Sequence, residues 1–322
     1  MRARWVLVAL AVAAAAGCGS PPAPPTPVDA TPAQVRPAGA TEITAAPATQ
    51  TSDCDREASL RPGPMPKPGS MPADSTMAAI VERGRLVVGV DQNTFLFGYR
   101  NPTTGRLEGF DIDLAREIAR RIFGDADRID LRVVDAAQRE TALTSGQVDL
   151  VVRTFSVTCQ RREKLAFSTV YFYANQRILA VEGSDIDSAA ALAGKRVCAV
   201  SGTTSVSTLF ALDPRPAVVG VTSWTDCLVM LQQGQIDAIS TDDVVLAGLA
   251  KQDPNVGIVG PSMGVEPYAI GMRKDREDLV RFVNGALDEI RSGGTWQRLY
   301  TTWLRSLGPS PGPPAPRYEA AP

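Results

Sequence analysis

The sequence predicts an α/β fold with two similar lobes, and two observations lead to this prediction. Short apolar strands alternate with helical segments between residues 85 and 304, an order that is typical of largely parallel sheets covered by helices. The order also starts again halfway along the chain, where the phrase GQVDL at 146–150 returns as GQIDA at 234–238. A strand–helix–strand unit that occurs twice, each time with this phrase, indicates two lobes with the same architecture.

The first half of the pattern contains three apolar strands, predicted at 85–90, 131–134 and 148–152. After the first strand, four apolar residues recur at every fourth position, namely Phe110, Leu114, Ile118 and Ile122. That spacing places them on one face of an amphipathic helix, and Gly124 is a typical residue for its C-terminal end. A shorter helix is expected at 139–145.

The second half repeats this order. Strands are predicted at 195–200 and 236–239, with a turn at 201–205 that opens one helix and a further helix at 225–232. A last strand is expected at 268–272. The helices that follow it, through Leu304, would return the chain to the first lobe.

The domain boundaries follow from these elements. The first lobe is predicted to comprise residues 77–177 and 268–307, and the second lobe residues 178–267. The flanking stretches 18–76 and 308–322 are rich in Pro, Ala, Thr and Ser. Such stretches bury too little apolar surface to offset the entropy lost on ordering, so they are predicted to be a disordered tether, with Cys54 stapled to the first lobe, and a disordered tail.

Residues 1–17 are predicted to be a signal peptide, because Arg2 and Arg4 precede an apolar run at 5–16 that is too short to span a bilayer. The run ends in AAGC at 15–18, which resembles a bacterial lipobox. This implies that Cys18 is lipidated and anchors the chain on the extracytoplasmic face of the cell membrane. The alternative is an ordinary signal peptide with an incidental cysteine.

Composition excludes several functions. The chain of 322 residues is long enough for one large or two modest domains. Its net charge of −2 gives no reason to expect a nucleic acid as partner. Histidine is absent, which excludes Ser-His-Asp and Cys-His catalysis and every metal site that uses histidine. We expect no metal and no other cofactor.

Four cysteines remain if Cys18 is lipidated, and an even number in an exported protein suggests two disulfides. Four cysteines allow three pairings. Cys198 on a predicted strand and Cys227 at a predicted helix start belong to the same half of the chain, so we pair them. Cys54 is then left for Cys159.

The candidate site begins where the predicted strand at 148–152 ends. Three hydroxyl residues follow at alternate positions, Thr154, Ser156 and Thr158, and two arginines come next, at 161 and 162. Hydroxyl and peptide N–H groups with a planar guanidinium can hold a small carboxylate. The alternative is a polar loop with two solvated arginines.

Two other segments should lie at the same edge, because ligands of open α/β sheets bind beyond the carboxyl ends of the strands. One is 91–97, after the first strand. The other is SGTTS at 201–205, where a helix N-terminus offers free N–H groups to an anion. For the second segment the alternative is simple N-capping.

Several phrases then resemble the polar amino-acid solute-binding proteins of ABC importers, which are bacterial extracellular solute-binding proteins of family 3. GFDIDL at 109–114, SVTCQRR at 156–162, SGTTS at 201–205 and GGTW at 293–296 stand in the family's order. The resemblance covers about residues 78 to 307 and looks closest to actinobacterial glutamate- and glutamine-binding lipoproteins. It implies a type II periplasmic-binding-protein fold whose two lobes close by a hinge, with crossover strands near 175–180 and 265–272.

The resemblance also implies roles for residues. Arg161 stands where the family clamps the ligand α-carboxylate, and Asp242 where an aspartate pairs with the ligand ammonium. Four further positions match head-group contacts, namely Thr154, Ser156, Thr203 and Thr204. Asp91 matches a ligand position after the first strand.

Departures from the family pattern bear on the side chain of the ligand. Arg139 matches the arginine that glutamate and aspartate binders aim at the ligand side chain; the alternative is a helix-surface residue. Ala136 and Ala137 replace the aromatic wall of glutamine binders. Arg153 stands where a small residue is commoner, and it either lines the cleft or points outward from the strand end. These features favour an acidic amino acid over a cationic one, with glutamate or aspartate expected first and glutamine or asparagine next.

The function that we expect is therefore that of a lipid-anchored receptor, monomeric, for a free L-amino acid. It would serve an ABC permease or, alternatively, report the ligand to a membrane sensor protein. The second alternative is an enzyme of the cyclohexadienyl dehydratase kind on the same fold. An enzyme needs a general acid or base in the cleft, for which Glu266, Asp242 and Asp91 are the candidates. We expect a binding protein and no catalysis.

Overall fold

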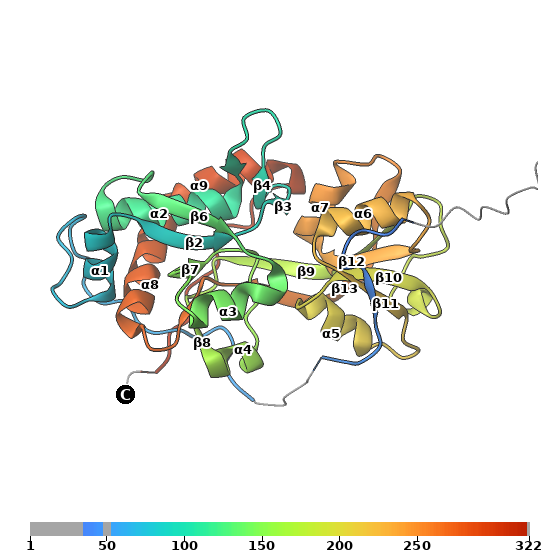
Figure 1. Cartoon of the computed structure of the whole chain (residues 1–322), viewed down its shortest axis with the longest axis horizontal. Helices are drawn as coiled ribbons and strands as arrows, with labels where there is room; N and C mark the ends of the chain where they lie inside the picture. The colour runs from blue at the N-terminus through green and yellow to red at the C-terminus, as the bar shows by residue number, and fades with distance from the viewer. Residues whose placement is uncertain (1–34, 48–52, 321–322) are drawn as a thin grey trace, which may run out of the picture. The chain divides into compact units, whose positions relative to one another are not determined.

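Two main sheets, one in each lobe, organise the chain. The structure is a computed structural model that describes residues 35–47 and 53–320, so the predicted signal peptide and Cys18 lie outside the described residues. Figure 1 shows the first lobe on the left and the second on the right, with helices packed on both sheets. Within the described ranges no helix has the length and apolar character that crossing a membrane requires.

The first-lobe sheet has five strands in the order β6-β2-β7-β14-β8. Their bounds are β2 Leu86–Val90, β6 Ile129–Val133, β7 Leu150–Val151, β8 Leu165–Phe167 and β14 Gly271–Arg273. β2 is parallel to β6 and β7, whereas β14 is antiparallel to β7 and β8. Between β2 and α2 along the chain, three short strands form a separate small sheet. They are β3 Asn93–Thr94, β4 Gly98–Arg100 and β5 Leu107–Glu108.

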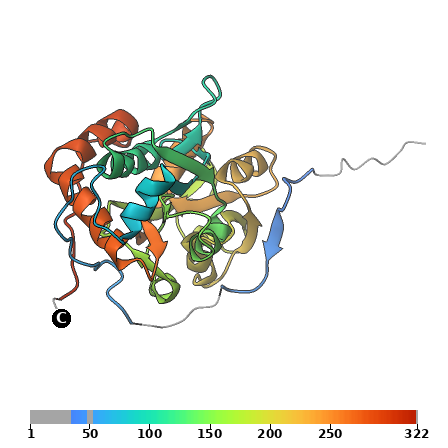
Figure 2. The same ribbon diagram turned by 60° about the vertical axis from the view of Figure 1, so that its left-hand side comes forward.

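Six helices belong to the first lobe: α1 Thr76–Arg83, α2 Phe110–Phe123, α3 Arg139–Thr144, α4 Cys159–Lys164, α8 Glu277–Ser292 and α9 Thr295–Leu299. The amphipathic helix predicted from its four-residue spacing is α2, which ends at Gly124 in the left-handed conformation. At its start, a Cβ on Gly109 would lie 2.3 Å from the carbonyl oxygen of Phe97, so only glycine fits there. The C-terminal helices α8 and α9 pack near α2, as predicted, and a π-helical turn at Tyr300–Leu304 follows them (Figures 1 and 2).

The second-lobe sheet has six strands in the order β1-β11-β10-β12-β9-β13. Their bounds are β1 Thr41–Ile43, β9 Phe172–Val181, β10 Arg196–Val200, β11 Ala217–Val221, β12 Ala238–Asp242 and β13 Val256–Tyr268. Its helices are α5 Thr204–Phe210, α6 Trp224–Gln232 and α7 Asp243–Ala250. β11 and α7 were not predicted, because neither the short apolar run of β11 nor the uniformly apolar α7 has a clear periodicity.

Two long antiparallel strands connect the lobes. β9 and β13 pair from Val181 with Val256 down to Phe172 with Tyr268, with a register shift between Val259 and Gly264. β9 covers the crossover expected near 175–180, whereas β13 overlaps the one expected near 265–272 only at 265–268. The strand predicted at 268–272 is in fact two, since β13 ends at Tyr268 and β14 starts at Gly271 in the first-lobe sheet.

The described parts of the predicted tether 18–76 are ordered, and the predicted attachment of Cys54 to the first lobe is present. β1 pairs antiparallel with β11 at the edge of the second-lobe sheet (Figures 1 and 2). Gly220 makes room for this strand, because a Cβ there would lie 2.6 Å from Cδ1 of Ile43. Further along, Cys54 is bonded to Cys159 at the start of α4. Backbone pairing, a disulfide and the packing of a few apolar side chains on the core, namely Ile43, Leu60, Met65 and Met71, thus order this stretch.

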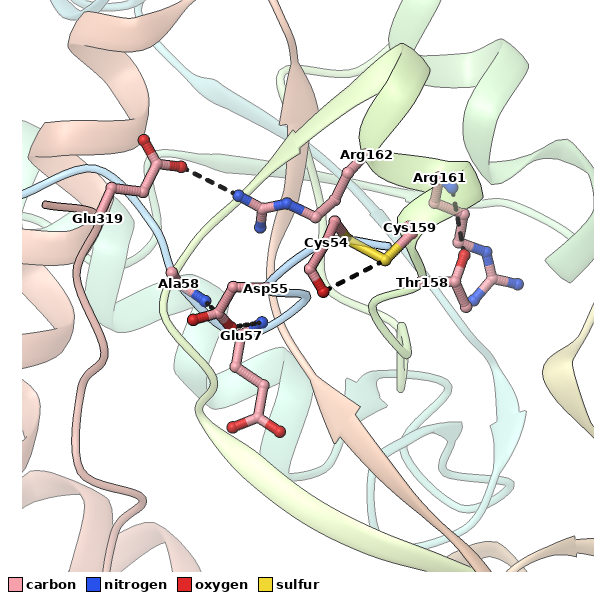
Figure 3. The surroundings of a disulfide bond; sticks show 9 residues. All are labelled: Cys54, Asp55, Glu57, Ala58, Thr158, Cys159, Arg161, Arg162 and Glu319. Carbon is pink, nitrogen blue, oxygen red and sulfur yellow. Dashed lines mark hydrogen bonds and ion pairs between the residues drawn. A yellow bond between two sulfur atoms is a disulfide. The ribbon is translucent and has the colours of Figure 1, made fainter. Parts of the chain in front are cut away.

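The disordered-tail prediction for 308–322 is wrong for the residues described up to 320. Ser59 and Tyr318 form a β-bridge, and the Ser59 hydroxyl receives a hydrogen bond of 2.8 Å from Asn284 in α8. Glu319 pairs with Arg162 at 3.1 Å (Figure 3). The tail is ordered by polar contacts with the N-terminal segment and with the first lobe.

Both predicted disulfides are present. Cys54 and Cys159 are separated by 105 residues, and Cys198 and Cys227 by 29. The second pair joins β10 to α6 inside the second lobe.

Candidate functional site

A cavity lies between the two lobes at the carboxyl ends of their strands. It is lined by first-lobe residues Arg139, Arg153, Thr154, Ser156 and Arg161, and by second-lobe residues Thr203, Thr204, Ser205, Trp224, Thr241, Asp242 and Val245. The enclosed space measures about 10 Å³, roughly what one water molecule needs. The lobes are therefore closed on each other, and a larger molecule can enter only if they open.

Eight of the nine residues that the sequence singled out line this cavity, and the ninth, Asp91, does not. Asp91 lies behind Arg153, to which it is joined by an ion pair of 2.9 Å. Its carboxylate also accepts hydrogen bonds from the backbone N–H groups of Gln92 and Asn93 and from the hydroxyl of Thr94. Asp91 contacts the cavity only through its arginine partner.

Three buried arginines give the first-lobe wall its charge. Arg139, Arg153 and Arg161 are 3%, 4% and 8% exposed, so Arg139 is not a helix-surface residue and Arg153 does not point outward. Burial lowers the pKa of Arg139, and the neighbouring cations Arg161 and Arg153 lower it further. Burial likewise lowers the pKa of Arg161. The wall thus concentrates positive charge out of contact with water.

Arg139 and Arg161 form no ion pair within 4 Å in the described part of the chain. Their guanidinium groups donate instead to backbone carbonyls, from Arg139 to Ala136 at 2.9 Å and from Arg161 to Ser156 at 2.6 Å. Both also donate across the cleft to the carbonyl of Gly202, at 3.1 and 3.0 Å. Neutral acceptors compensate a buried cation less well than an anion does.

The segment between β7 and α4 presents Arg153 and the hydroxyls of Thr154 and Ser156. Thr154 has a positive φ of 39°, and its backbone N–H donates to the buried carboxyl of Asp111 at 2.8 Å. The Tyr171 hydroxyl donates to the other oxygen of the same carboxyl at 2.8 Å. Burial raises the pKa of Asp111 to about 7. This carboxyl therefore fixes an unusual backbone turn next to the cavity.

Helix α4 then sets the direction of Arg161. The Thr158 hydroxyl caps the helix by accepting from the backbone N–H of Arg161 at 3.1 Å. Figure 3 shows Arg161 and Arg162 on opposite sides of α4, so that Arg162 reaches Glu319. The two adjacent arginines thus have different surroundings, and only Arg161 lines the cavity.

The second-lobe wall is acidic and hydroxylated. Asp242, at the end of β12, accepts a hydrogen bond from the Tyr268 hydroxyl through Oδ2, while its buried Oδ1 has no partner among the described residues. Burial and the nearby Glu266 raise the pKa of Asp242 to about 8. Glu266 in turn accepts from the Thr204 hydroxyl at 2.9 Å. The orphan Oδ1 marks a place for a donor.

The sequence reasoning missed several residues at this site. Phe155 places its ring 4.2 Å from Cζ of Arg139 and 4.8 Å from Cζ of Arg161. Trp224 and Val245 supply the apolar part of the lining. Trp224 directly follows Ser223, the N-cap of α6. A serine at a helix start after a strand could have indicated that the next residue lies at the edge of the sheet. For Phe155 no sequence signal was available.

Taken together, the groups that line the cavity suit a small molecule that carries anionic groups at one end and a cationic group at the other and that enters when the lobes open. Guanidinium and hydroxyl donors face it from the first lobe, and the carboxyl of Asp242 faces it from the second. No cluster of three or more potential metal ligands occurs in the described ranges.

Comparison with known proteins agrees with this chemistry. A family model described as bacterial extracellular solute-binding proteins, family 3, matches residues 86–306. The ABC transporter glutamine-binding protein GlnH of Bacillus subtilis (strain 168) is 35% identical over 231 residues, which are 71% of this chain and 85% of the relative. The glutamate-binding protein GluB of Corynebacterium glutamicum is 31% identical over 240 residues, 71% of this chain and 81% of the relative.

Solved structures agree as well. An ancestral arginine-binding protein bound to glutamine is 33% identical, with a TM-score of 0.65 over 69% of this chain and 98% of its own. A mutant of the arginine-binding protein ArgBP from T. maritima is 29% identical, with a TM-score of 0.67 over 71% of this chain and 98% of its own. The two-lobed fold expected from the sequence is thereby confirmed.

Proposed function

The chain belongs to the bacterial extracellular solute-binding proteins of family 3, and from this we propose that it binds an acidic L-amino acid, glutamate or aspartate, between its lobes. Glutamine and asparagine would bind more weakly. The observation that carries the proposal is the pair of buried arginines, Arg139 and Arg161, that have no carboxylate partner within 4 Å in the described chain.

In the proposed complex, one set of residues would bind the α-carboxylate and the ammonium, the groups that every amino acid shares. The α-carboxylate would lie on Arg161, with Ser156 and the backbone at Thr154 as further donors. The ammonium would donate to Asp242, whose Oδ1 lacks a partner among the described residues. Hydroxyl and N–H groups at Thr203 and Thr204 would contact the ligand from the second lobe.

The ligand side chain would then face Arg139, which gives the preference for an acid. A neutral side chain would leave a buried cation uncompensated, whereas a carboxylate would form charge-assisted hydrogen bonds of roughly 1.5–3 kcal/mol each. Because about 1.4 kcal/mol corresponds to a factor of ten, we expect glutamate or aspartate to bind about 10- to 100-fold more tightly than the corresponding amides.

A titration of the full chain with each of the twenty amino acids by calorimetry tests the proposal. Arg161→Ala should abolish binding of all ligands. Arg139→Ala should weaken glutamate and aspartate far more than glutamine and asparagine. Arg132→Ala is a matched control, because this arginine has a half-exposed side chain on β6 and does not line the cavity. An equal loss for acids and amides in the Arg139 variant would contradict the assignment, and absence of binding to any amino acid would refute the function.

The relatives are named as binding proteins of ABC transporters, and we propose the same use here, delivery of the ligand to a membrane permease by a chain anchored through Cys18. We also propose that the chain is a monomer and that its lobes meet at residues 177 and 267.

Catalytic turnover is not expected from the two carboxyl groups near the cavity. Asp242 is assigned to the ligand ammonium, and Glu266 accepts a hydrogen bond from Thr204. Product formation in the calorimetric samples would argue for an enzyme instead.

A further inference from the structure

We infer that Phe155 is a positioning residue that gives the site its preference for acidic ligands, because its ring holds the guanidinium groups of Arg139 and Arg161 in place. The inference rests on the proposed function, since it assigns to Phe155 a part in reading the anionic groups of the ligand. It concerns a side chain that does not itself line the cavity.

The geometry is that of two cation–π contacts on one ring. Cζ of Arg139 lies 4.2 Å and Cζ of Arg161 4.8 Å from the ring centroid, both inside the range of about 6 Å in which the ring quadrupole attracts a cation. The ring is 1% exposed. Such contacts are stronger when they are desolvated than at an exposed site, so this ring is a substantial partner for both cations.

The ring itself has little freedom to move. Its neighbour Phe167 packs edge-on with ring centroids 5.1 Å apart, and the backbone carbonyl of Phe155 accepts from the N–H of Ala269 at 3.1 Å. Gly271 in β14 lies so close that a Cβ there would be 3.0 Å from two ring carbons. These contacts hold the ring in place against the first-lobe sheet. The ring can therefore fix the positions of the two guanidinium groups that contact it.

The two arginines depend on the ring for their positions, because no other group in the described chain fully offsets their positive charges. They repel each other, and the only acceptors that they contact are backbone carbonyls. An aliphatic side chain of similar size would fill the same space but would offer no negative face. Without the aromatic face we expect the two guanidinium groups to separate and to lose the spacing at which they can bind two carboxylates.

Fluorination of the ring separates electrostatics from packing. Phenylalanine with one, two and three fluorine atoms is incorporated at position 155 of the full chain, and each added fluorine weakens the negative face while the shape changes little. We expect the affinity for glutamate and aspartate to fall stepwise, by about 2- to 30-fold over the series. Phe155→Leu should lose at least as much affinity, and Phe155→Tyr should retain it.

The same series at Phe282 is the matched control, since this ring is buried in α8 of the first lobe and no guanidinium of the described chain lies over it. Its fluorination should leave affinity unchanged. A flat response at position 155, or an equal fall at both positions, would overturn the inference. If the unmodified chain binds no amino acid, the proposed function fails, whereas binding without the stepwise fall means that only the role of Phe155 fails.

Discussion

The charge of Asp242 depends on the contents of the cavity. It is buried, it has Glu266 nearby, and one of its oxygens lacks a partner among the described residues. Burial of a carboxyl favours its neutral form, and the pKa of about 8 places that form in the majority at pH 7. A ligand ammonium would reverse this preference, because a cation beside the carboxyl favours the charged form.

This gives a pH dependence with a definite sign. Ligand binding at pH 7 should release a proton from Asp242, and affinity should therefore rise with pH, by up to about tenfold per unit, until the pH passes the pKa of about 8. Calorimetry at pH 7 in two buffers with different ionisation enthalpies measures the release. Asp242→Asn should abolish it and weaken binding, whereas Asp237→Asn, at the surface pair with Arg196, should leave it intact. Proton uptake, or equal heats in both buffers, would contradict the assignment.

The strand followed by alternating hydroxyls located Thr154 and Ser156, and the family resemblance supplied most of the other lining residues, Arg139 and Asp242 among them. Sequence reasoning could not separate Arg161 from Arg162 by physics alone, since that requires the direction of α4. Phe155 escaped for a related reason. The alternation of residues along a strand indicates which side chains point into the cavity. It does not indicate that Phe155, which points away from the cavity, contacts two arginines from α3 and α4.

At the scale of elements, regular helices were easier to predict than short strands. α2 was expected from its four apolar positions and begins and ends within a residue or two of the prediction. β1 has three residues among prolines and alanines, and its partner β11 lies about 175 positions along the chain. No local pattern reveals such a strand, because its hydrogen bonds are made with a strand that is distant in the sequence.

The Cys54–Cys159 disulfide should be what keeps the N-terminal segment on α4. In the chain-entropy account, a link across 105 residues stabilises by roughly 4–5 kcal/mol. We expect the Cys54→Ser, Cys159→Ser double variant to lose stability of this order in chemical denaturation and to be cut rapidly by proteases at 53–60. The Cys198→Ser, Cys227→Ser variant is the control, since it should lose stability without exposing that segment. Arg317 also pairs with Asp55 at 2.8 Å. An unchanged cleavage rate in the first variant would show that this ion pair and the hydrogen bond of Ser59 suffice.

For the whole molecule, closure depends on close backbone contacts on two sides of the cleft. A Cβ on Gly202, in the turn before α5, would lie 2.6 Å from Cα of Ala137 in the first lobe. A Cβ on Gly248, in α7, would lie 2.8 Å from the carbonyl oxygen of Phe95. Glycine at these two positions lets the lobes approach until Arg139 and Arg161 reach across to the second lobe.

Alanine at either position should therefore hold the lobes apart. A binding protein of this kind gains affinity from contacts that both lobes make in the closed state, so we expect Gly202→Ala and Gly248→Ala to weaken ligand binding by one to two orders of magnitude, on the order of 1.4–3 kcal/mol. Small-angle scattering with saturating ligand should show a larger radius of gyration than for the unmodified chain.

The positive φ of 77° at Gly202 complicates the first variant, because alanine is strained there whatever the space. Gly234 supplies the control, since it has a φ of 65° and no atom within 4 Å of an added Cβ. Gly234→Ala should lose about as much thermal stability as Gly202→Ala and yet keep its affinity. If both variants bind ligand equally well, closure does not require the contact between Gly202 and Ala137, and the reach of Arg139 and Arg161 to the second lobe must tolerate a wider cleft.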